Sequence, residues 1–264
     1  MTYSPAIPFG GYSGYLFLDR TRDRQQEVME ATPAIERNTA AFAERIGTIT
    51  SAADLVADRQ LLQVALGAFG LDEDINNKYL VQKILESDTS DRTSMASKFA
   101  DRRYKALADA FGFGNEGGAR TGEAGFAERI VARYTDRQFE IAAGDVDQDM
   151  RLALGFGRDL AEIAAGEGSE NSKWFTLMSM PPMRSVMETA LGLPKSFGQL
   201  DLDRQLDEFR SRAEKKFGTS DLGELAAPEM VEEVVKTFLV MSEVQQLNAS
   251  SLSRASAALA LLQG

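Results

Sequence analysis

The sequence contains no cysteine and no histidine, and these two absences exclude several kinds of chemistry. Without cysteine there are no disulfides, no thiolate nucleophiles and no cysteine-ligated zinc or iron–sulfur sites. Without histidine the chain lacks the usual general base near neutral pH and the most common transition-metal ligand. An enzyme built from this chain would therefore depend on carboxylates, lysine, tyrosine or a hard cation bound by oxygen.

Basic residues are outnumbered, with 29 Lys and Arg against 40 Asp and Glu, which gives a net charge of −11. This charge and the lack of any Lys/Arg block exclude nucleic acid and anionic membranes as expected partners. No run approaches the roughly 18 apolar residues of a spanning helix. Residues 1–26 lack the basic start and the small-residue cleavage site of a secretory signal. We therefore expect a cytoplasmic protein without membrane insertion.

Helical periodicity is the dominant pattern, whereas runs of alternating β-branched residues do not occur. Thr32 followed by Pro33 is typical of a helix start, and Ser51 with Asp54 resembles a capping box. The predicted fold class is all-α, a multi-helix bundle. Helices are predicted at residues 33–46, 51–69, 75–85, 101–111, 125–143, 146–165, 170–180, 183–191, 201–217, 228–247 and, as a weaker pattern, 250–262.

Two segments of the sequence are similar to each other. RQLLQVALG (59–67) and RSVMETALG (184–192) share Arg, Ala, Leu and Gly, and each is followed by F-G and then L-D-x-D before the next predicted helix. This order favours two related helical lobes from an internal duplication. Asp72 and Asp74, and likewise Asp201 and Asp203, are expected to cap the helices that follow.

The expected organisation has three parts. Residues 1–20 form an aromatic and glycine-rich N-terminal segment, and residues 21–227 form the helical domain. Its lobes cover about 21–115 and 125–227, joined by a glycine-rich loop. A helical tail covers 228–264.

The glycine-rich loop contains Gly112, Gly114 and Gly117 in the spacing G-x-G-x-x-G. A dinucleotide fingerprint needs a β-strand that leads into the glycine turn. The preceding RRYKALADAF has a helical apolar face and no strand pattern. We therefore predict a flexible loop and expect no cofactor.

Two acidic segments resemble calcium loops in part. DEDINN (72–77) and DVDQDM (145–150) place oxygens at loop positions 1, 3 and 5, but the later positions lack the required Gly and Glu. Helix capping is the preferred interpretation, so no metal site is assigned. A carboxylate-dependent enzyme is a remote alternative, and no catalytic residue is assigned. Its candidate residues are Glu140, Asp145, Asp147, Asp149 and Arg151.

Aromatic and apolar patterns predict one core helix and two chain ends suited to contacts. Trp174 lies in a predicted core helix that ends before Pro181. Tyr3, Phe9, Tyr12, Tyr15 and Phe17 are expected to pack on their own domain, with partner contact as the alternative. Leu252, Ala255, Leu259 and Leu262 recur at spacings of 3, 4 and 3, a narrow seam expected to dock on this domain or on a partner.

Several long segments resemble an uncharacterised alphaproteobacterial family, domain of unknown function 1217, from about residue 10 to 218. They are GGYSGYLFLDRT, DLVADRQLLQVALGAFGLDEDINNKYLVQKILESD, DRRYKALADAFGF, RQFEIAAGDVDQDMRLAL and KWFTLMSMPPMRSVMETALGLPKSFGQLDLDRQ. The resemblance implies a helical protein encoded among flagellar basal-body genes, with no established activity and no known catalytic residues.

The resemblance leads to two hypotheses about function. The first is a non-enzymatic helical protein in flagellar assembly or structure that binds basal-body or export proteins. The second is a cytoplasmic adaptor or chaperone that holds a flagellar export substrate and is not itself incorporated.

Overall fold

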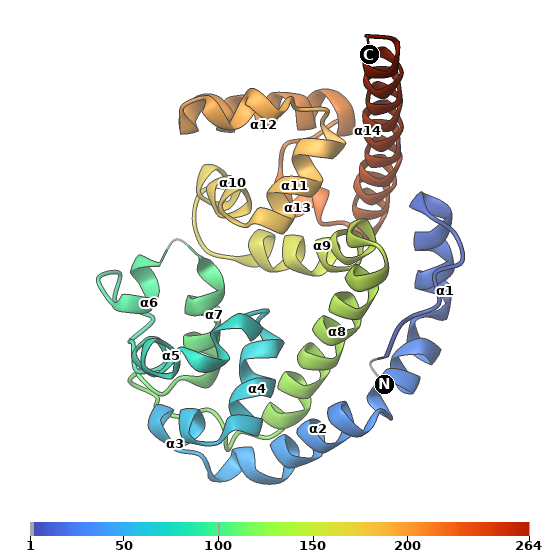
Figure 1. Cartoon of the computed structure of the whole chain (residues 1–264). Helices are drawn as coiled ribbons and strands as arrows, with labels where there is room; N and C mark the ends of the chain where they lie inside the picture. Colours follow the sequence, from blue (N-terminus) through green and yellow to red (C-terminus); the bar gives the residue numbers. More distant parts are fainter. Residues whose placement is uncertain (1–2, 100, 264) are drawn as a thin grey trace. The chain divides into compact units, whose positions relative to one another are not determined.

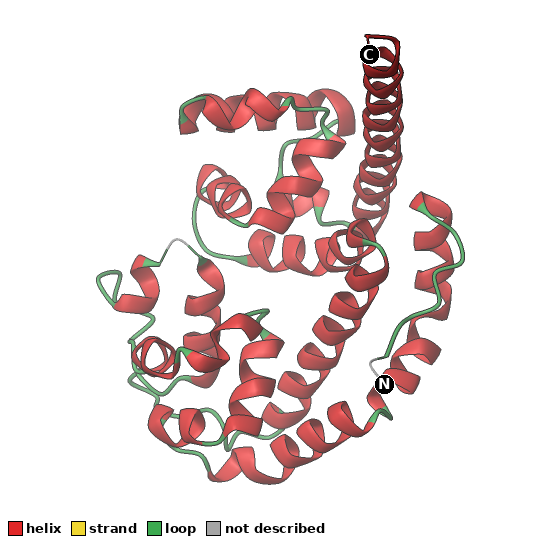
Figure 2. Ribbon diagram, in the orientation of Figure 1, coloured by secondary structure: helices red, strands yellow, loops and turns green. Residues whose placement is uncertain are grey.

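The computed structural model describes residues 3–99 and 101–263, with the side chains of residue 195 and of residues from 249 onward left out. Within this part of the chain there are helices, turns and loops and no β-strand (Figure 2). The predicted all-α class is confirmed. Contacts divide the chain into two compact units, Met1–Ala6 with Arg20–Asp145 (unit 1) and Ile7–Asp19 with Val146–Gly264 (unit 2).

Helix α1, Gly11–Glu30, begins in unit 2 and ends in unit 1 (Figure 1). The other elements of unit 1 are α2 Pro33–Arg45, η1 Ile46–Thr48, α3 Ala52–Ala57, α4 Arg59–Ala68, η2 Asp72–Asn76, α5 Lys78–Leu85, α6 Met95–Lys98, α7 Arg102–Phe111 and α8 Phe126–Val146. Those of unit 2 are α9 Gln148–Ala165, α10 Glu170–Ser179, α11 Pro181–Ala190, η3 Lys195–Gln199, α12 Leu202–Phe217, α13 Leu222–Leu225 and α14 Pro228–Gln263.

The predicted helices that correspond to α2 and to α7 through α12 agree with the structure to within three residues at each end. The helix predicted for 51–69 is instead two helices, because Asp58 accepts hydrogen bonds from the Gln60 and Leu61 amides at 3.0 and 3.2 Å and so starts α4 anew. The tail predicted as two helices is the single helix α14.

Sequence reasoning missed α1, since the glycines of residues 10–14 are poor helix formers in isolation. The structure gives Gly14 a steric reason. A β-carbon at this position would lie 2.0 Å from the carbonyl oxygen of Phe9. The preceding backbone therefore passes so close to α1 that only glycine fits there.

The core of unit 1 is built around α4, whose Leu61, Leu62 and Leu66 are fully buried. Helix α8 contributes to the same core through Phe126, Ile130 and Tyr134. For this reason unit 1 extends to residue 145, whereas the sequence analysis placed the junction of the lobes at the glycine-rich loop.

The core of unit 2 contains Trp174, which is completely buried in α10. Its indole Nε1 donates a hydrogen bond to the Ser220 carbonyl at 2.9 Å, and its ring centroid lies 5.9 Å from that of Phe209 on α12. Helix α10 ends at Ser179, and Pro181 begins α11. The predicted core helix and its stop are both confirmed.

The glycine-rich loop is shaped by close backbone packing. Gly112 ends α7 with φ of 71°. A β-carbon on Gly114 would lie 2.3 Å from the Glu86 carbonyl oxygen. The loop is also tied down, because Asn115 Oδ1 accepts from the Thr89 amide at 2.9 Å and Thr121 Oγ1 donates to the Ile49 carbonyl at 2.5 Å. The predicted loop is confirmed. The sequence did not indicate the hydrogen bonds that tie it to residues 49 and 89.

Helices α4 and α11 end in the same motif. Gly70 and Gly192 have φ of 68° and 64°, and the next amide in each case bonds back across the last turn, Leu71 to the Leu66 carbonyl at 2.9 Å and Leu193 to the Glu188 carbonyl at 2.8 Å. This is a Schellman C-cap, with a buried leucine after the glycine. The motif aligns AFGL (68–71) with ALGL (190–193), three residues away from the A-L-G match in the sequence.

The carbonyl of the last residue of each helix and the carbonyl of the glycine two residues later also accept hydrogen bonds from cationic side chains. Cations are favoured there, because the C-terminal end of a helix carries partial negative charge. The donors are Arg133 to Ala68 at 2.7 Å and Arg103 to Gly70 in unit 1, and Lys216 to Ala190 at 2.6 Å and Arg212 to Gly192 at 3.1 Å in unit 2.

The aspartate pairs after these motifs behave differently from each other. Asp201 caps α12, as predicted, by accepting from the Arg204 amide at 2.9 Å. Asp72 and Asp74, by contrast, do not cap a helix. Asp72 accepts from the Gln138 side chain at 2.9 Å and Asp74 accepts from the Tyr104 hydroxyl at 2.7 Å. The prediction that Asp72 and Asp74 cap a helix was wrong, because side chains from other helices donate to these carboxylates in place of the local backbone amides.

We predict that Gly114→Ala lowers the free energy of unfolding by about 2 kcal/mol, because the new methyl group would overlap the Glu86 carbonyl. Gly117→Ala is the matched control, since a β-carbon there has nothing within 4 Å and the residue has no positive φ. Urea denaturation of the two variants measures the difference. Equal stabilities would contradict a steric role for this glycine.

Asp201→Ala is expected to lower the free energy of unfolding by about 1 kcal/mol, because the Arg204 amide loses its cap. Asp203 accepts no capping hydrogen bond in the structure, so Asp203→Ala should change stability little. Thermal melts of both single variants test this. A loss confined to the Asp203 variant would refute the assignment of the cap.

Tyr104 links stability to alkaline pH. Burial and the hydrogen bond to Asp74 raise the pKa of Tyr104 to about 12, from an ordinary value of 10.0. The folded state therefore favours the neutral phenol, and this contribution is complete below pH 10 and is lost as the pH rises towards 12. Tyr104→Phe should cost about 1 kcal/mol at pH 8 and less at pH 11. Denaturation curves at both pH values provide the measurement, and an equal cost at both would contradict the linkage.

Candidate functional site

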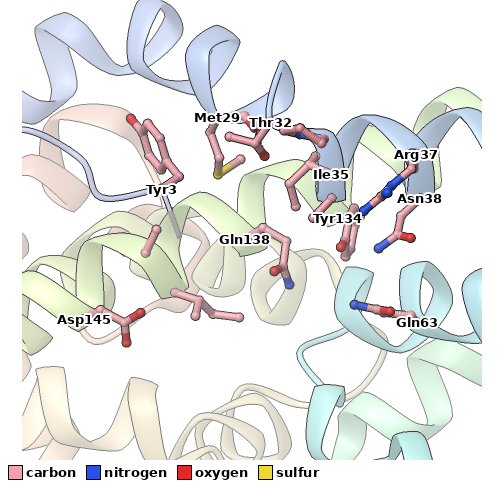
Figure 3. Close-up of a pocket in the computed structure, with 14 residues that line it drawn as sticks. Tyr3, Met29, Thr32, Ile35, Arg37, Asn38, Gln63, Tyr134, Gln138 and Asp145 are labelled. Carbon is pink, nitrogen blue, oxygen red and sulfur yellow. Dashed lines mark hydrogen bonds between the residues drawn. The ribbon is translucent and has the colours of Figure 1, made fainter. Parts of the chain in front are cut away.

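Unit 1 contains a pocket of about 430 Å³ between α1 and α2 on one side and α4 and α8 on the other (Figure 3). This volume lies within the range of small-ligand pockets, roughly 300 to 1,000 Å³. The lining residues are Tyr3, Met29, Thr32, Pro33, Ala34, Ile35, Arg37, Asn38, Gln63, Tyr134, Gln138, Ile141, Ala142 and Asp145.

Local sequence explains both walls of the pocket. Thr32 Oγ1 donates to the Met29 carbonyl at 2.6 Å, and Pro33 opens α2 directly afterwards, so two residues, 31 and 32, interrupt the helix between α1 and α2. On the opposite wall the lining residues of α8 fall on one helical face. They are Tyr134, Gln138, Ile141, Ala142 and Asp145, with spacings of 4, 3, 1 and 3.

The inner polar groups of the pocket are held by neighbours. Tyr134 is only 1% exposed, and burial raises the pKa of its hydroxyl, although the hydrogen bond from Asn38 acts in the opposite direction. Gln138 is oriented through its bond to Asp72. Gln63 and Gln138 could not be identified from the sequence, because they lie on separate helices, α4 and α8, and no local sequence pattern links them.

An extended N-terminal segment forms one border of the pocket. The Tyr3 ring lies 6.4 Å from the Phe139 ring, and burial raises the Tyr3 pKa. Gln25 of α1 pairs with the backbone of Ala6 in both directions: its Oε1 accepts from the amide at 2.7 Å and its Nε2 donates to the carbonyl at 3.2 Å. A side-chain carboxamide of unit 1 therefore binds a peptide backbone.

The other predicted aromatic residues of the N-terminus pack in unit 2. The Tyr12 hydroxyl donates to Glu232 of α14 at 2.8 Å, and its ring stacks on Tyr15 at 6.2 Å. Phe9 meets Phe17 edge to face at 6.3 Å. Tyr12 thus contacts α14 of its own chain, as expected, whereas the Phe9 ring contacts Phe17 within the segment and remains 58% exposed.

Three of the acidic residues considered for metal binding or catalysis, Glu140, Asp147 and Asp149, have separate structural partners, and Asp145 lines the pocket. Asp147 caps α9 by accepting from the Asp149 amide at 2.9 Å, and Asp149 accepts from Ser242 at 2.5 Å. Glu140 is 3% exposed and lies 3.8 Å from Arg137. Among the described residues, no three acidic side chains gather in a way that could hold a metal ion.

Helix α14 has an exposed apolar face. Val234, Val235, Phe238 and Leu239 are buried, but Val240, Val244 and Leu247 are 43%, 44% and 68% exposed. These three follow each other at spacings of 4 and 3 and so lie on one side of the helix. We call them the α14 surface. The predicted seam Leu252, Ala255, Leu259 and Leu262 lies outside the described side chains, although the backbone there is helical.

No helix in the described part of the chain has both the length and the apolar character needed to cross a membrane. The fold is similar to the crystal structure of a protein from Agrobacterium tumefaciens, with a TM-score of 0.74 and 25% identity over 92% of this chain and 99% of that one. No curated protein matches the sequence. A family model described as protein of unknown function, DUF1217, matches residues 68–231. Because this match spans more than half of the sequence, the chain belongs to that family.

Proposed function

We propose that this protein acts in the assembly or structure of the bacterial flagellum by binding other proteins, without enzymatic activity of its own. Membership of the family supports this proposal, because the sequence resemblance implies that members of this family are encoded among flagellar basal-body genes. The single structural observation that carries it is the α14 surface. Exposed apolar side chains on one helix face are typical of protein interaction sites.

The chemistry of α14 suggests the kind of contact that it makes. Residues 244–264 contain one charged side chain, Arg254, in a chain with a net charge of −11. A segment with so few charges offers little electrostatic steering, so its affinity would come from apolar burial. Its partner would therefore present an apolar groove or helix face.

A carboxylate-dependent enzyme has less support. The chain has no histidine or cysteine, Asp147 is engaged in capping α9, and Asp149 accepts a hydrogen bond from Ser242 of α14. An adaptor or chaperone for a flagellar export substrate is the second candidate. The exposed apolar helix favours it as well, because an unfolded substrate would bind through apolar side chains.

The test is deletion of the gene and complementation in a flagellated host. Deletion should abolish or reduce swimming without slowing growth, and the wild-type gene should restore it. The double variant Val244→Gln, Leu247→Gln should restore it poorly, because it removes the apolar face while glutamine keeps good helix propensity. Tyr79→Gln is the matched control, since Tyr79 of α5 is 76% exposed and lies in unit 1.

Normal swimming and intact basal bodies in the deletion strain would contradict the proposal. Cell fractionation distinguishes a structural component of the flagellum from a chaperone for an export substrate. A structural component should copurify with basal bodies, whereas a chaperone should remain in the soluble fraction with its substrate.

A further inference from the structure

The pocket in unit 1 has opposite charges at its two ends. Arg37 comes from α2 and Asp145 from the end of α8, and the two side chains lie on opposite sides of the pocket in Figure 3. Neither forms an ion pair or hydrogen bond with another described residue, and both side chains are exposed. The charges are therefore available to a ligand that spans the length of the pocket.

Between these ends the pocket offers apolar surface and carboxamides. Met29, Ile35 and Ile141 supply the apolar part, and Gln63 is an exposed carboxamide with no hydrogen bond to another described residue. A carboxamide carries both a donor and an acceptor, as a peptide bond does. Gln25 already shows this pairing on the neighbouring stretch of α1, where it binds the backbone of Ala6 in both directions.

We propose that this pocket binds an extended peptide segment of a partner protein. An apolar side chain of the peptide packs against Ile35 and Ile141, and a backbone amide pairs with Gln63. An acidic group lies beside Arg37 and a basic group beside Asp145. A volume of about 430 Å³ admits a few side chains and not a folded domain, so the ligand is a segment.

This proposal deepens the proposed function. It rests on that function in one respect only, namely that the protein binds other proteins. The site is separate from the α14 surface, which belongs to unit 2. Variants of the two sites can therefore be tested independently of each other.

The experiment is a parallel selection of phage-displayed random dodecapeptides on the immobilised full-length chain and on its Arg37→Glu variant. The wild type should enrich peptides with an apolar residue flanked by Asp or Glu on one side and by Lys or Arg on the other. The Arg37→Glu variant should replace the acidic preference by a basic one. Arg92→Glu, an exposed charge reversal elsewhere in unit 1, should leave the selected sequences unchanged.

A synthetic peptide from the wild-type selection provides the quantitative test by fluorescence anisotropy. Gln63→Ala and Asp145→Arg should each weaken binding by about fivefold or more. The double variant Val244→Gln, Leu247→Gln should bind it as the wild type does. Circular dichroism should show all these variants folded, because the altered side chains are exposed.

Two results would overturn the proposal. One is the absence of any enriched peptide on the wild type. The other is enrichment of the same sequences on wild type and Arg37→Glu. Neither result depends on swimming, so a failure here leaves the flagellar proposal standing, and normal swimming of the deletion strain leaves peptide binding standing.

Discussion

The ends of buried helices impose the constraint on which both units depend. The last carbonyls of a helix have no partner within it and are costly to bury unpaired. Helix α4 lies in the core of unit 1; Arg133 of α8 donates to the carbonyl of its last residue, Ala68, and Arg103 of α7 donates to the carbonyl of Gly70 in the C-cap motif. Each of these bonds fixes a neighbouring helix against α4. Satisfying the end of α4 therefore also positions α7 and α8, and α8 carries one wall of the pocket.

In unit 2 the end of α11 is also satisfied by cationic side chains, but these come from a single helix. The carbonyl of Ala190, the last residue of α11, accepts from Lys216, and the carbonyl of Gly192 in the C-cap motif accepts from Arg212; both donors come from α12. In unit 1 the donors come from two helices, and the helix that follows the motif, α5, supplies neither. The likeness of the two motifs therefore follows from the physics of a helix end, whatever their history. Internal duplication stays a prediction, and the A-L-G match does not support it, because Gly67 lies inside α4 against the Tyr134 ring.

Local signals explain how much of this fold could be predicted from sequence. The Ser51 cap, the Asp201 cap, the stop at Gly70 and the stop before Pro181 each act within a few residues, so the helix ends that they set were predictable. Features set by distant residues were missed. Helix α1 depends on the close passage of the Phe9 backbone, and the pocket brings together side chains from four helices whose own patterns are unremarkable.

The lack of histidine has a consequence for both candidate sites. Histidine is the side chain whose ordinary pKa places its change of charge between about pH 5 and 8, and this chain has none. The charged ends of the pocket are instead an arginine and an aspartate, whereas the α14 surface is apolar. The pocket contacts would be screened by salt, whereas apolar burial on α14 would not. Ionic strength is thus a condition that distinguishes binding at one site from binding at the other.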